Sequence, residues 1–441
     1  MNNIQQARLL GQQIWLDSLS RSMIIKGELN NKIRQGVSGV TTNPAIFLAA
    51  IKNDELYQQQ MRALKADGKT AQEIYETMAC ADVQAACDIF LTEYQYSNGN
   101  AGFVSIEVNP ALANDTDGTV FEARRLLQKI NRPNVMIKIP ATAAGIKAVE
   151  RLSCECNINT TLIFDGETVK KIEQAFYKGN PPANGRIVAS VFLSRIDTAI
   201  DDKLPAHLQG KTAVAMAQAL YNEMKDHTPP AALIEAWQNA EEEEIDTDEE
   251  AGCCGGGGCG CGGHHHHHHD DEHECCGHHH HHDDEHECCG HHHHHEEKHE
   301  CCGSHHHHDD KHECCGNCDE CDNCHCDDEP VKIRPQYRED CPLLTLLWAS
   351  TATKNPAYSD TLYIDNLIGK NTVNTLPEKA MNAFLEHGKA ELMNTDNAQQ
   401  ILTEVAQYAD LSAIANDLQN KGLQQFQAAF DEILAFIDGF E

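Results

Sequence analysis

Short apolar runs alternate with segments of helical periodicity over most of the chain. The runs are nearly continuous in apolar residues, which is typical of strands buried on both faces of a parallel sheet. Most are followed by a stretch such as "DGTVFEARRLLQKI", in which apolar residues recur every three or four positions. Eight such runs occur, at residues 14–19, 39–43, 102–108, 135–140, 158–164, 187–195, 343–351 and 361–368.

Eight strands that alternate with helices predict an α/β fold of the (β/α)8 TIM-barrel type. The alternative is an open doubly wound sheet, but no G-x-G-x-x-G follows the first run and no G-x-x-x-x-G-K-[ST] is present. The predicted barrel is discontinuous. Residues 1–240 and 330–441 carry the strand and helix pattern, and residues 241–329 form an insertion before the seventh strand.

The insertion is built from repeats. A 13-residue unit that begins with "HECCG" starts at His273, His286, His299 and His312. The insertion holds 16 of the 21 cysteines, 25 of the 28 histidines and 28 of the 68 acidic residues, but almost no aliphatic or aromatic residue. Such a segment cannot offset its ordering entropy by burying apolar surface, so we expect it to be disordered unless a ligand orders it.

Thiolate and imidazole groups at this density predict binding of divalent transition metals, with zinc or nickel favoured. The opposite interpretation is a repeat expanded by slippage, which binds metal without having been selected for it. The candidate metal ligands are His273, Cys275, Cys276, His286, Cys288, Cys289, His299, Cys301, Cys302, His312, Cys314, Cys315, Cys318, Cys321, Cys324 and Cys326.

The formal net charge of −34 argues against nucleic acid or an anionic membrane as a partner, because both require a basic face. No run approaches the roughly 18–20 apolar residues that a membrane span needs. The first residues lack the basic and apolar regions of a signal peptide, so we expect a cytoplasmic protein.

Charged residues interrupt three of the predicted strands. In "VMIKIP", alternation places Met136, Lys138 and Pro140 on one face, and the aliphatic residues on the other, so Lys138 should point into the barrel. Asp17 and Glu107 occur in two other strands in the same way. A structural ion pair is one explanation. The other is amine catalysis, because burial favours the neutral, nucleophilic form of lysine and a carboxylate can move the protons.

Several motifs together resemble the transaldolase family of the class I aldolase superfamily, in its longer bacterial and cyanobacterial form. They are "GVTTNPAIF", "SIEVNPALANDT", "VMIKIPATAAGI", "NINTTLIF", "VASVFLSRID" and "LWASTATKNPAYSDTLYIDNLIG". The resemblance covers nearly all of residues 1–240 and 330–441, in order.

The resemblance implies a barrel enzyme of the pentose phosphate pathway that needs no cofactor for catalysis. Such enzymes transfer a dihydroxyacetone unit from sedoheptulose 7-phosphate to glyceraldehyde 3-phosphate, giving erythrose 4-phosphate and fructose 6-phosphate. By motif, Lys138 resembles the Schiff-base lysine and Asp17 the acid/base acting on the C4 hydroxyl. Glu107 and Thr161 resemble the pair that holds the catalytic water.

The resemblance also implies a set of substrate-binding residues. Lys354 departs from the pattern of short transaldolases, which place an arginine two residues after the serine of "WAST", whereas this chain reads "STATKNP". Lysine binds phosphate as a point charge rather than as a bidentate fork. The set is Thr41, Asn43, Asn159, Ser190, Phe192, Arg195, Ser350 and Lys354.

Two other functions remain open from the sequence. One is a metal storage or buffer protein on an inactive barrel. The other is a related Schiff-base aldolase that cleaves a sugar phosphate without transferring the fragment. The expected partners are sugar phosphates and metal ions, and the expected assembly is a monomer or a homodimer.

Overall fold

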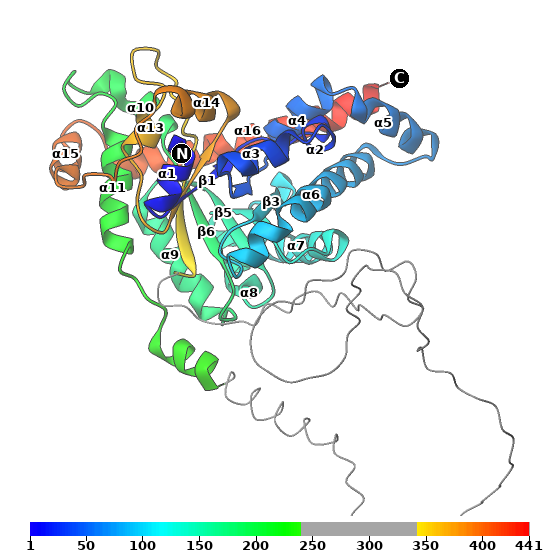
Figure 1. The fold of residues 1–441 in the computed structure, drawn as a ribbon, viewed down its shortest axis with the longest axis horizontal. Helices are drawn as coiled ribbons and strands as arrows, with labels where there is room; N and C mark the ends of the chain where they lie inside the picture. Colours follow the sequence, from blue (N-terminus) through cyan, green and yellow to red (C-terminus); the bar gives the residue numbers. More distant parts are fainter. Residues whose placement is uncertain (240–341, 441) are drawn as a thin grey trace, which may run out of the picture. The chain divides into compact units, whose positions relative to one another are not determined.

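Parallel strands close into a barrel in the order β1 to β8, with β8 paired to β1. Strands β1, β3, β5 and β6 are labelled in Figure 1. The computed structural model describes residues 1–239 and 342–440. The expected (β/α)8 barrel is confirmed. Its strands are β1 (Gln12–Leu16), β2 (Gly39–Val40), β3 (Phe103–Glu107), β4 (Val135–Pro140), β5 (Asn157–Ile163), β6 (Ile187–Phe192), β7 (Leu344–Ala349) and β8 (Thr372–Leu376).

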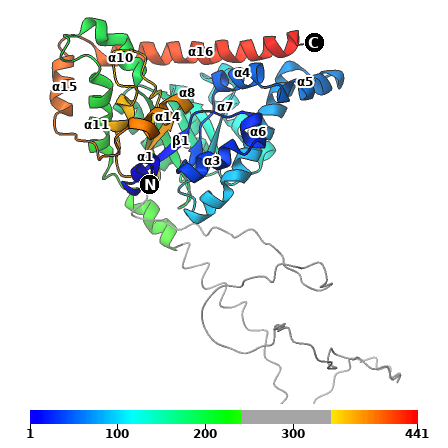
Figure 2. The same cartoon turned by 45° about the horizontal axis from the view of Figure 1, so that its top comes forward.

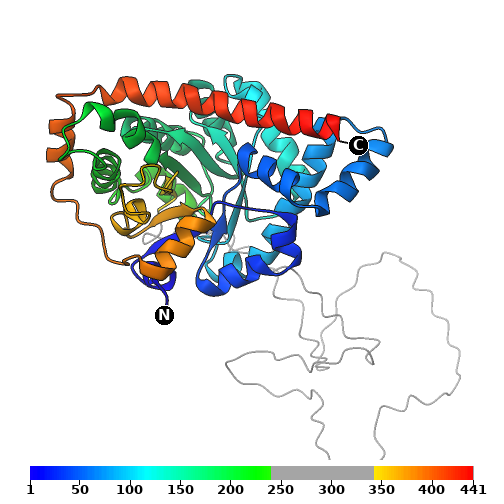
Figure 3. The ribbon, with the colours of Figure 1, turned by 90° about the horizontal axis from the view of Figure 1, so that it is seen from above.

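Helices lie around the strands when the barrel is seen from above (Figure 3). In the described part of the chain, none of them is both long enough and apolar enough to cross a membrane. The helices are α1 (Asn3–Leu9), α2 (Arg21–Ile25), α3 (Glu28–Gln35), α4 (Pro44–Asn53), α5 (Leu56–Ala66), α6 (Ala71–Tyr96), α7 (Thr116–Ile130), α8 (Ala143–Leu152), α9 (Gly166–Lys178), α10 (Ser194–Ile200), α11 (Thr212–Met224), α13 (Leu362–Asp365), α14 (Glu378–His387), α15 (Ala398–Val405) and α16 (Leu411–Gly439), with short 3-10 helices at Pro110–Leu112 and Asp201–Lys203.

Strand β4 shows how the sequence specifies the barrel. All six residues of "VMIKIP" are buried, as expected for a strand packed on both faces. Met136 lines a cavity at the amino ends of the strands, and Lys138 lines a second cavity at their carboxyl ends. The two side chains therefore share the inward face, as the alternation predicted.

The prediction of the eighth strand was wrong. Residues 361–368 include helix α13, and the strand is β8, whose sequence is "TVNTL". β8 is polar, and its polar side chains make hydrogen bonds inside the barrel: Asn374 is fully buried and its Nδ2 donates to the Tyr363 carbonyl at 3.0 Å. A buried strand of this composition lacks the apolar run by which strands are recognised.

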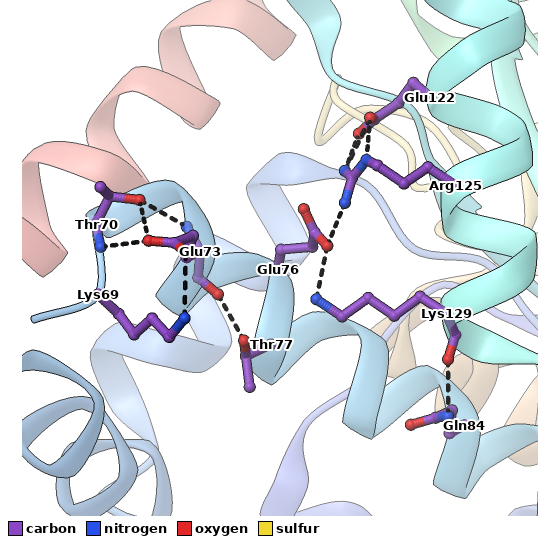
Figure 4. Close-up of polar contacts among 9 residues, drawn as sticks. All are labelled: Lys69, Thr70, Glu73, Glu76, Thr77, Gln84, Glu122, Arg125 and Lys129. Atoms are coloured by element: carbon purple, nitrogen blue, oxygen red, sulfur yellow. Dashed lines mark hydrogen bonds and ion pairs between the residues drawn. The ribbon is translucent and has the colours of Figure 1, made fainter. Parts of the chain in front are cut away.

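An ion-pair network ties α6 to α7 on the outside of the barrel (Figure 4). Glu76 of α6 lies between Arg125 and Lys129 of α7, with its Oε1 2.6 Å from Lys129 Nζ. Arg125 also pairs with Glu122 on its own helix at 2.8 Å. Each partly exposed ion pair contributes only about 0–1 kcal/mol, but the shared carboxylate fixes the spacing of the two helices beside β3.

The last helix, α16, crosses the molecule beside the carboxyl end of the barrel (Figure 2). Its 29 residues span about 43 Å at 1.5 Å per residue. It contacts α4, α6 and α10 and also reaches β5. The carboxyl ends of the strands are therefore covered on one side by a helix from the far end of the chain.

Candidate active site at the carboxyl ends of the strands

A cavity of about 190 Å³ opens at the carboxyl ends of the strands, the face on which TIM-barrel enzymes carry their active sites. Ten of the twelve predicted catalytic and substrate-binding residues line it. Glu107 and Asn159 lie outside the lining. The lining consists of Asp17, Thr41, Asn43, Ala45, Lys138, Thr161, Ser190, Phe192, Arg195, Ala349, Ser350, Ala352, Lys354, Thr375, Pro377 and Phe426.

Lys138 is buried, with only 4% of its surface exposed, and its amine sits among polar groups at the bottom of this cavity. Nζ donates to the Thr42 carbonyl at 3.0 Å. Its distance to Glu107 Oε2 is 3.7 Å, which is an ion-pair distance rather than a hydrogen bond. Glu107 stands directly opposite Lys138 in the β3–β4 register, so the pairing of the strands brings the two charges together.

Asp17 directly follows β1, one residue beyond the end of the strand in which it was predicted. Thr41 Oγ1 donates to Asp17 Oδ1 at 2.8 Å and lies 2.7 Å from Thr375 Oγ1. Burial raises the pKa of the Asp17 carboxyl, and the positive charge of Lys138 and the Thr41 hydrogen bond oppose that rise. The carboxylate is therefore held in one orientation in a setting that eases its protonation.

Glu107 is buried. Desolvation raises the pKa of its carboxyl to about 7, because this effect outweighs the attraction of the Lys138 charge. Within residues 1–239 and 342–440, neither of its carboxylate oxygens has a hydrogen-bond partner. The residue lines a separate cavity of about 20 Å³, between β3, α6 and α7. Such a volume has room for about one water molecule.

A chain of hydrogen bonds joins three strands beneath the cavity. Asn159 Nδ2 donates to Ser105 Oγ at 2.9 Å, and Ser190 Oγ donates to Asn159 Oδ1 at 2.7 Å. Asn159 faces Lys138 in the β4–β5 register. Two residues further along β5, Thr161 is buried, and its hydroxyl has no hydrogen-bond partner in the described part of the chain.

Two positively charged side chains, Arg195 and Lys354, line the 190 Å³ cavity. Arg195 lies in the first turn of α10, with its guanidinium carbon 5.2 Å from the centre of the Phe192 ring. Ser350 has a positive φ of 54°, uncommon for a residue other than glycine, and its Oγ is 3.0 Å from Ser194 Oγ. Lys354 lines the same cavity. Among the described residues, no carboxylate lies within ion-pairing distance of Arg195 or Lys354.

Several lining residues escaped the sequence analysis. Phe426 of α16 places its ring 5.8 Å from Lys138 Nζ, although the two residues are far apart in the chain. Thr375 reaches the site from β8, the strand that was predicted at the wrong position. The amphipathic pattern of α16 is that of any helix packed on a core, so only the tertiary structure reveals that one of its aromatic residues faces the amine.

All of the predicted metal ligands lie between residues 240 and 341 and are outside the described residues. In the part that is described, no group of three or more His, Cys, Asp or Glu residues is placed to hold a metal ion. The lining of the 190 Å³ cavity offers one carboxylate, Asp17, and no thiol or imidazole. Its chemistry is that of an amine, hydroxyls and cations.

Comparison with known proteins agrees with this site. A model of the "Transaldolase/Fructose-6-phosphate aldolase" family matches residues 14–437. A transaldolase from Neisseria meningitidis serogroup C is 36% identical over 450 residues, covering 99% of each chain. One from Thiobacillus denitrificans is 31% identical over 99% of this chain and 100% of its own. "Transaldolase 2" of a Nostoc species is 30% identical over 100% of this chain and 97% of its own. The amine-centred site and these similarities agree, and the chain belongs to the transaldolase/fructose-6-phosphate aldolase family, as an enzyme of the transaldolase type.

Proposed function

We propose that this protein transfers a dihydroxyacetone unit between sugar phosphates through a Schiff base on Lys138. The observation that carries the proposal is the buried amine on the inward face of β4, which opens into a cavity bordered by one carboxylate and two cations. A ketone held there lies within reach of the nucleophile, while its phosphate lies at the cationic rim.

Imine formation is the first step. The Lys138 amine attacks the C2 carbonyl of a ketose phosphate, and the resulting carbinolamine loses water to give an iminium ion. We assign Glu107 and Thr161 to this water. Both are buried, and their side-chain oxygens lack hydrogen-bond partners among the described residues. Buried polar atoms of this kind are normally satisfied by ordered water, and Thr161 lines the cavity into which the Lys138 amine opens.

Carbon–carbon cleavage is the second step. Asp17 takes the proton of the C4 hydroxyl, the electrons of the C3–C4 bond move into the iminium ion, and an aldose phosphate leaves. The raised pKa of Asp17 makes it a better proton acceptor than an ordinary aspartate. The enamine left on Lys138 then attacks the aldehyde of the acceptor sugar, and hydrolysis of the new iminium ion releases the product.

Polar groups around the amine are proposed to hold the sugar hydroxyls. Asn43 caps α4, with its Oδ1 accepting from the Ile46 amide at 3.0 Å, which leaves its NH2 group to donate to substrate. Asn159 and Ser190 present an oriented pair from neighbouring strands. Thr41 borders the same region.

The phosphate group is proposed to lie against Arg195, Ser350 and Lys354, beside the ring of Phe192. The prediction is that Arg195→Met raises KM for fructose 6-phosphate by about 10- to 100-fold, because a charge-assisted hydrogen bond contributes roughly 1.5–3 kcal/mol. Lys354→Met should raise it less, since lysine does not bind in a bidentate way. Steady-state kinetics with fructose as the matched unphosphorylated donor provide the control. An equal loss with fructose would show that these cations do not bind phosphate.

We further propose that residues 241–329 are a metal-binding insertion that takes no part in catalysis. The proposal rests on their cysteine and histidine content and on the geometry of the barrel. In the chain, the insertion precedes β7, which begins at Leu344. All the site residues assigned above lie outside the insertion, and ten of the twelve line the cavity at the carboxyl ends of the strands.

One experiment tests both proposals. The full chain, and a variant in which residues 241–329 are replaced by a short Gly/Ser linker, are assayed for transfer from fructose 6-phosphate to erythrose 4-phosphate. Elemental analysis after loading with zinc or nickel gives the metal content. Both proteins should be active, and only the full chain should bind several metal ions, with binding weakening below about pH 6 as the ligands become protonated.

The outcomes separate the two proposals. A full chain that cleaves fructose 6-phosphate but does not transfer the fragment would be an aldolase rather than a transaldolase. A folded but inactive deletion variant would place the insertion in the catalytic machinery. Metal retained by the deletion variant would place the ligands in the barrel.

A further inference from the structure

Helix α16 directs three residues of one face toward the ends of β4 and β5. Gln419, Gly422 and Phe426 are spaced by three and four positions, so they lie on the same side of the helix. Gln419 Nε2 donates to the Ala141 carbonyl at 3.0 Å and to the Leu162 carbonyl at 3.2 Å. Ala141 directly follows β4, which carries Lys138, and Leu162 directly follows Thr161 on β5. One side-chain amide therefore links the strand segments that carry the amine and the proposed water ligand.

Leu162 is in an unusual conformation for its position in a strand. Its φ is +59°, in the left-handed region that residues with a side chain seldom adopt, and the β5–β6 register shifts between Thr160 and Ile163. A backbone held in such a conformation needs support from its surroundings. The hydrogen bond from Gln419 provides part of it, and this bend sets the direction of the neighbouring Thr161.

The helix also fits closely on Leu162. A Cβ at Gly422 would lie 2.7 Å from Leu162 Cδ2, nearer than real Cβ atoms come to their neighbours, so the absence of a side chain allows the helix to pack at this depth. One turn further along, Phe426 is 5% exposed and lines the substrate cavity, with its ring 5.8 Å from Lys138 Nζ. The depth at which α16 packs therefore also sets how closely an aromatic ring covers the amine.

We propose that α16 controls the fate of the enamine: Gln419 is a positioning residue that fixes Thr161 through Leu162, and Phe426 restricts water at the Lys138 adduct. This inference rests on the proposed Schiff-base function.

The enamine can react in two ways. In the transfer reaction, its C3 forms a bond to the acceptor aldehyde. In the unproductive reaction, C3 takes a proton from the Asp17 carboxyl and water adds to C2. The C2–N bond then breaks, giving free dihydroxyacetone and the Lys138 amine.

The test compares Gln419→Met, which keeps the length of the side chain but cannot donate, with Gln425→Met, an exposed glutamine on the same helix. Fructose 6-phosphate and erythrose 4-phosphate are supplied, and sedoheptulose 7-phosphate and free dihydroxyacetone are both measured. Gln419→Met should raise the ratio of released to transferred dihydroxyacetone by about tenfold, the scale expected when reacting groups shift by a fraction of an ångström. Gln425→Met should match the parent protein. A second variant, Phe426→Leu, should raise the ratio in the same direction.

A merely structural role predicts a different result. Lower stability would reduce both products together and leave their ratio unchanged, and that outcome in both Gln419→Met and Phe426→Leu would overturn the proposal. Should Gln419→Met not fold, Phe426→Leu alone decides by the same ratio. Borohydride trapping of the parent protein separates the two levels of the argument. A parent that transfers without a Lys138 adduct refutes the Schiff-base function itself, whereas an adduct with unchanged ratios refutes only the role of α16.

Discussion

Lys138→Met is expected to abolish transfer while leaving the barrel folded. Without the amine no imine forms, and loss of a nucleophile lowers kcat by roughly 10⁴-fold or more. The fold should persist because methionine is apolar and of similar length, and β4 is buried on both faces. Among the described residues, the substitution removes the hydrogen bond to the Thr42 carbonyl and the ion pair with Glu107. Glu107, left without its charged neighbour, can take up a proton because its pKa is already near 7.

Covalent trapping identifies the residue directly. Borohydride reduction in the presence of fructose 6-phosphate should leave a three-carbon adduct on Lys138, located by peptide mass spectrometry. Lys147→Met, at an exposed position on α8, is the matched control and should be labelled and active like the parent. An active preparation labelled on another lysine, or not labelled at all, would rule out this role for Lys138.

Asp17→Asn is expected to lower kcat by about 10²–10⁴-fold, the usual contribution of a positioned acid/base. The Thr41 hydrogen bond can persist to the amide oxygen, so the geometry of the site should change little. In the parent, kcat/KM should fall as pH decreases through the raised pKa of Asp17, because the acceptor form disappears. This acidic decrease should be absent from the plot of kcat/KM against pH for Asp17→Asn. A near-normal rate in Asp17→Asn would remove this residue from the mechanism.

Stability gives an independent check on the same residue. Since the folded-state pKa of Asp17 is raised, the folded protein binds more protons than the unfolded chain between the two pKa values. The parent therefore loses stability as pH rises through this interval, and the neutral asparagine does not. At pH 7, Asp17→Asn should unfold at the same or a higher temperature than the parent, while Asp67→Asn, an exposed control, should show no such gain.

The sequence was sufficient to predict most of the barrel and most of the residues that line the cavity at its carboxyl end. Successive side chains of a strand point to opposite faces. In "VMIKIP" this alternation puts Lys138 on the face opposite the aliphatic residues, which predicts that it points into the barrel, as the structure shows. β8 was not found because three of its five buried residues are Thr or Asn, and burial of such side chains depends on hydrogen-bond partners such as the Tyr363 carbonyl. Phe426 could not be found for a related reason. Its contact with Lys138 depends on how a helix docks across the barrel, and local periodicity says nothing about that.

The place of α16 in the chain has a consequence for the order of folding. This helix supplies the ring beside Lys138 and the amide that links β4 and β5. The pairing of β8 with β1, which closes the barrel, involves none of its residues. Closure of the barrel and completion of the pocket wall therefore depend on different segments, and the order in which these segments fold decides when the amine is covered.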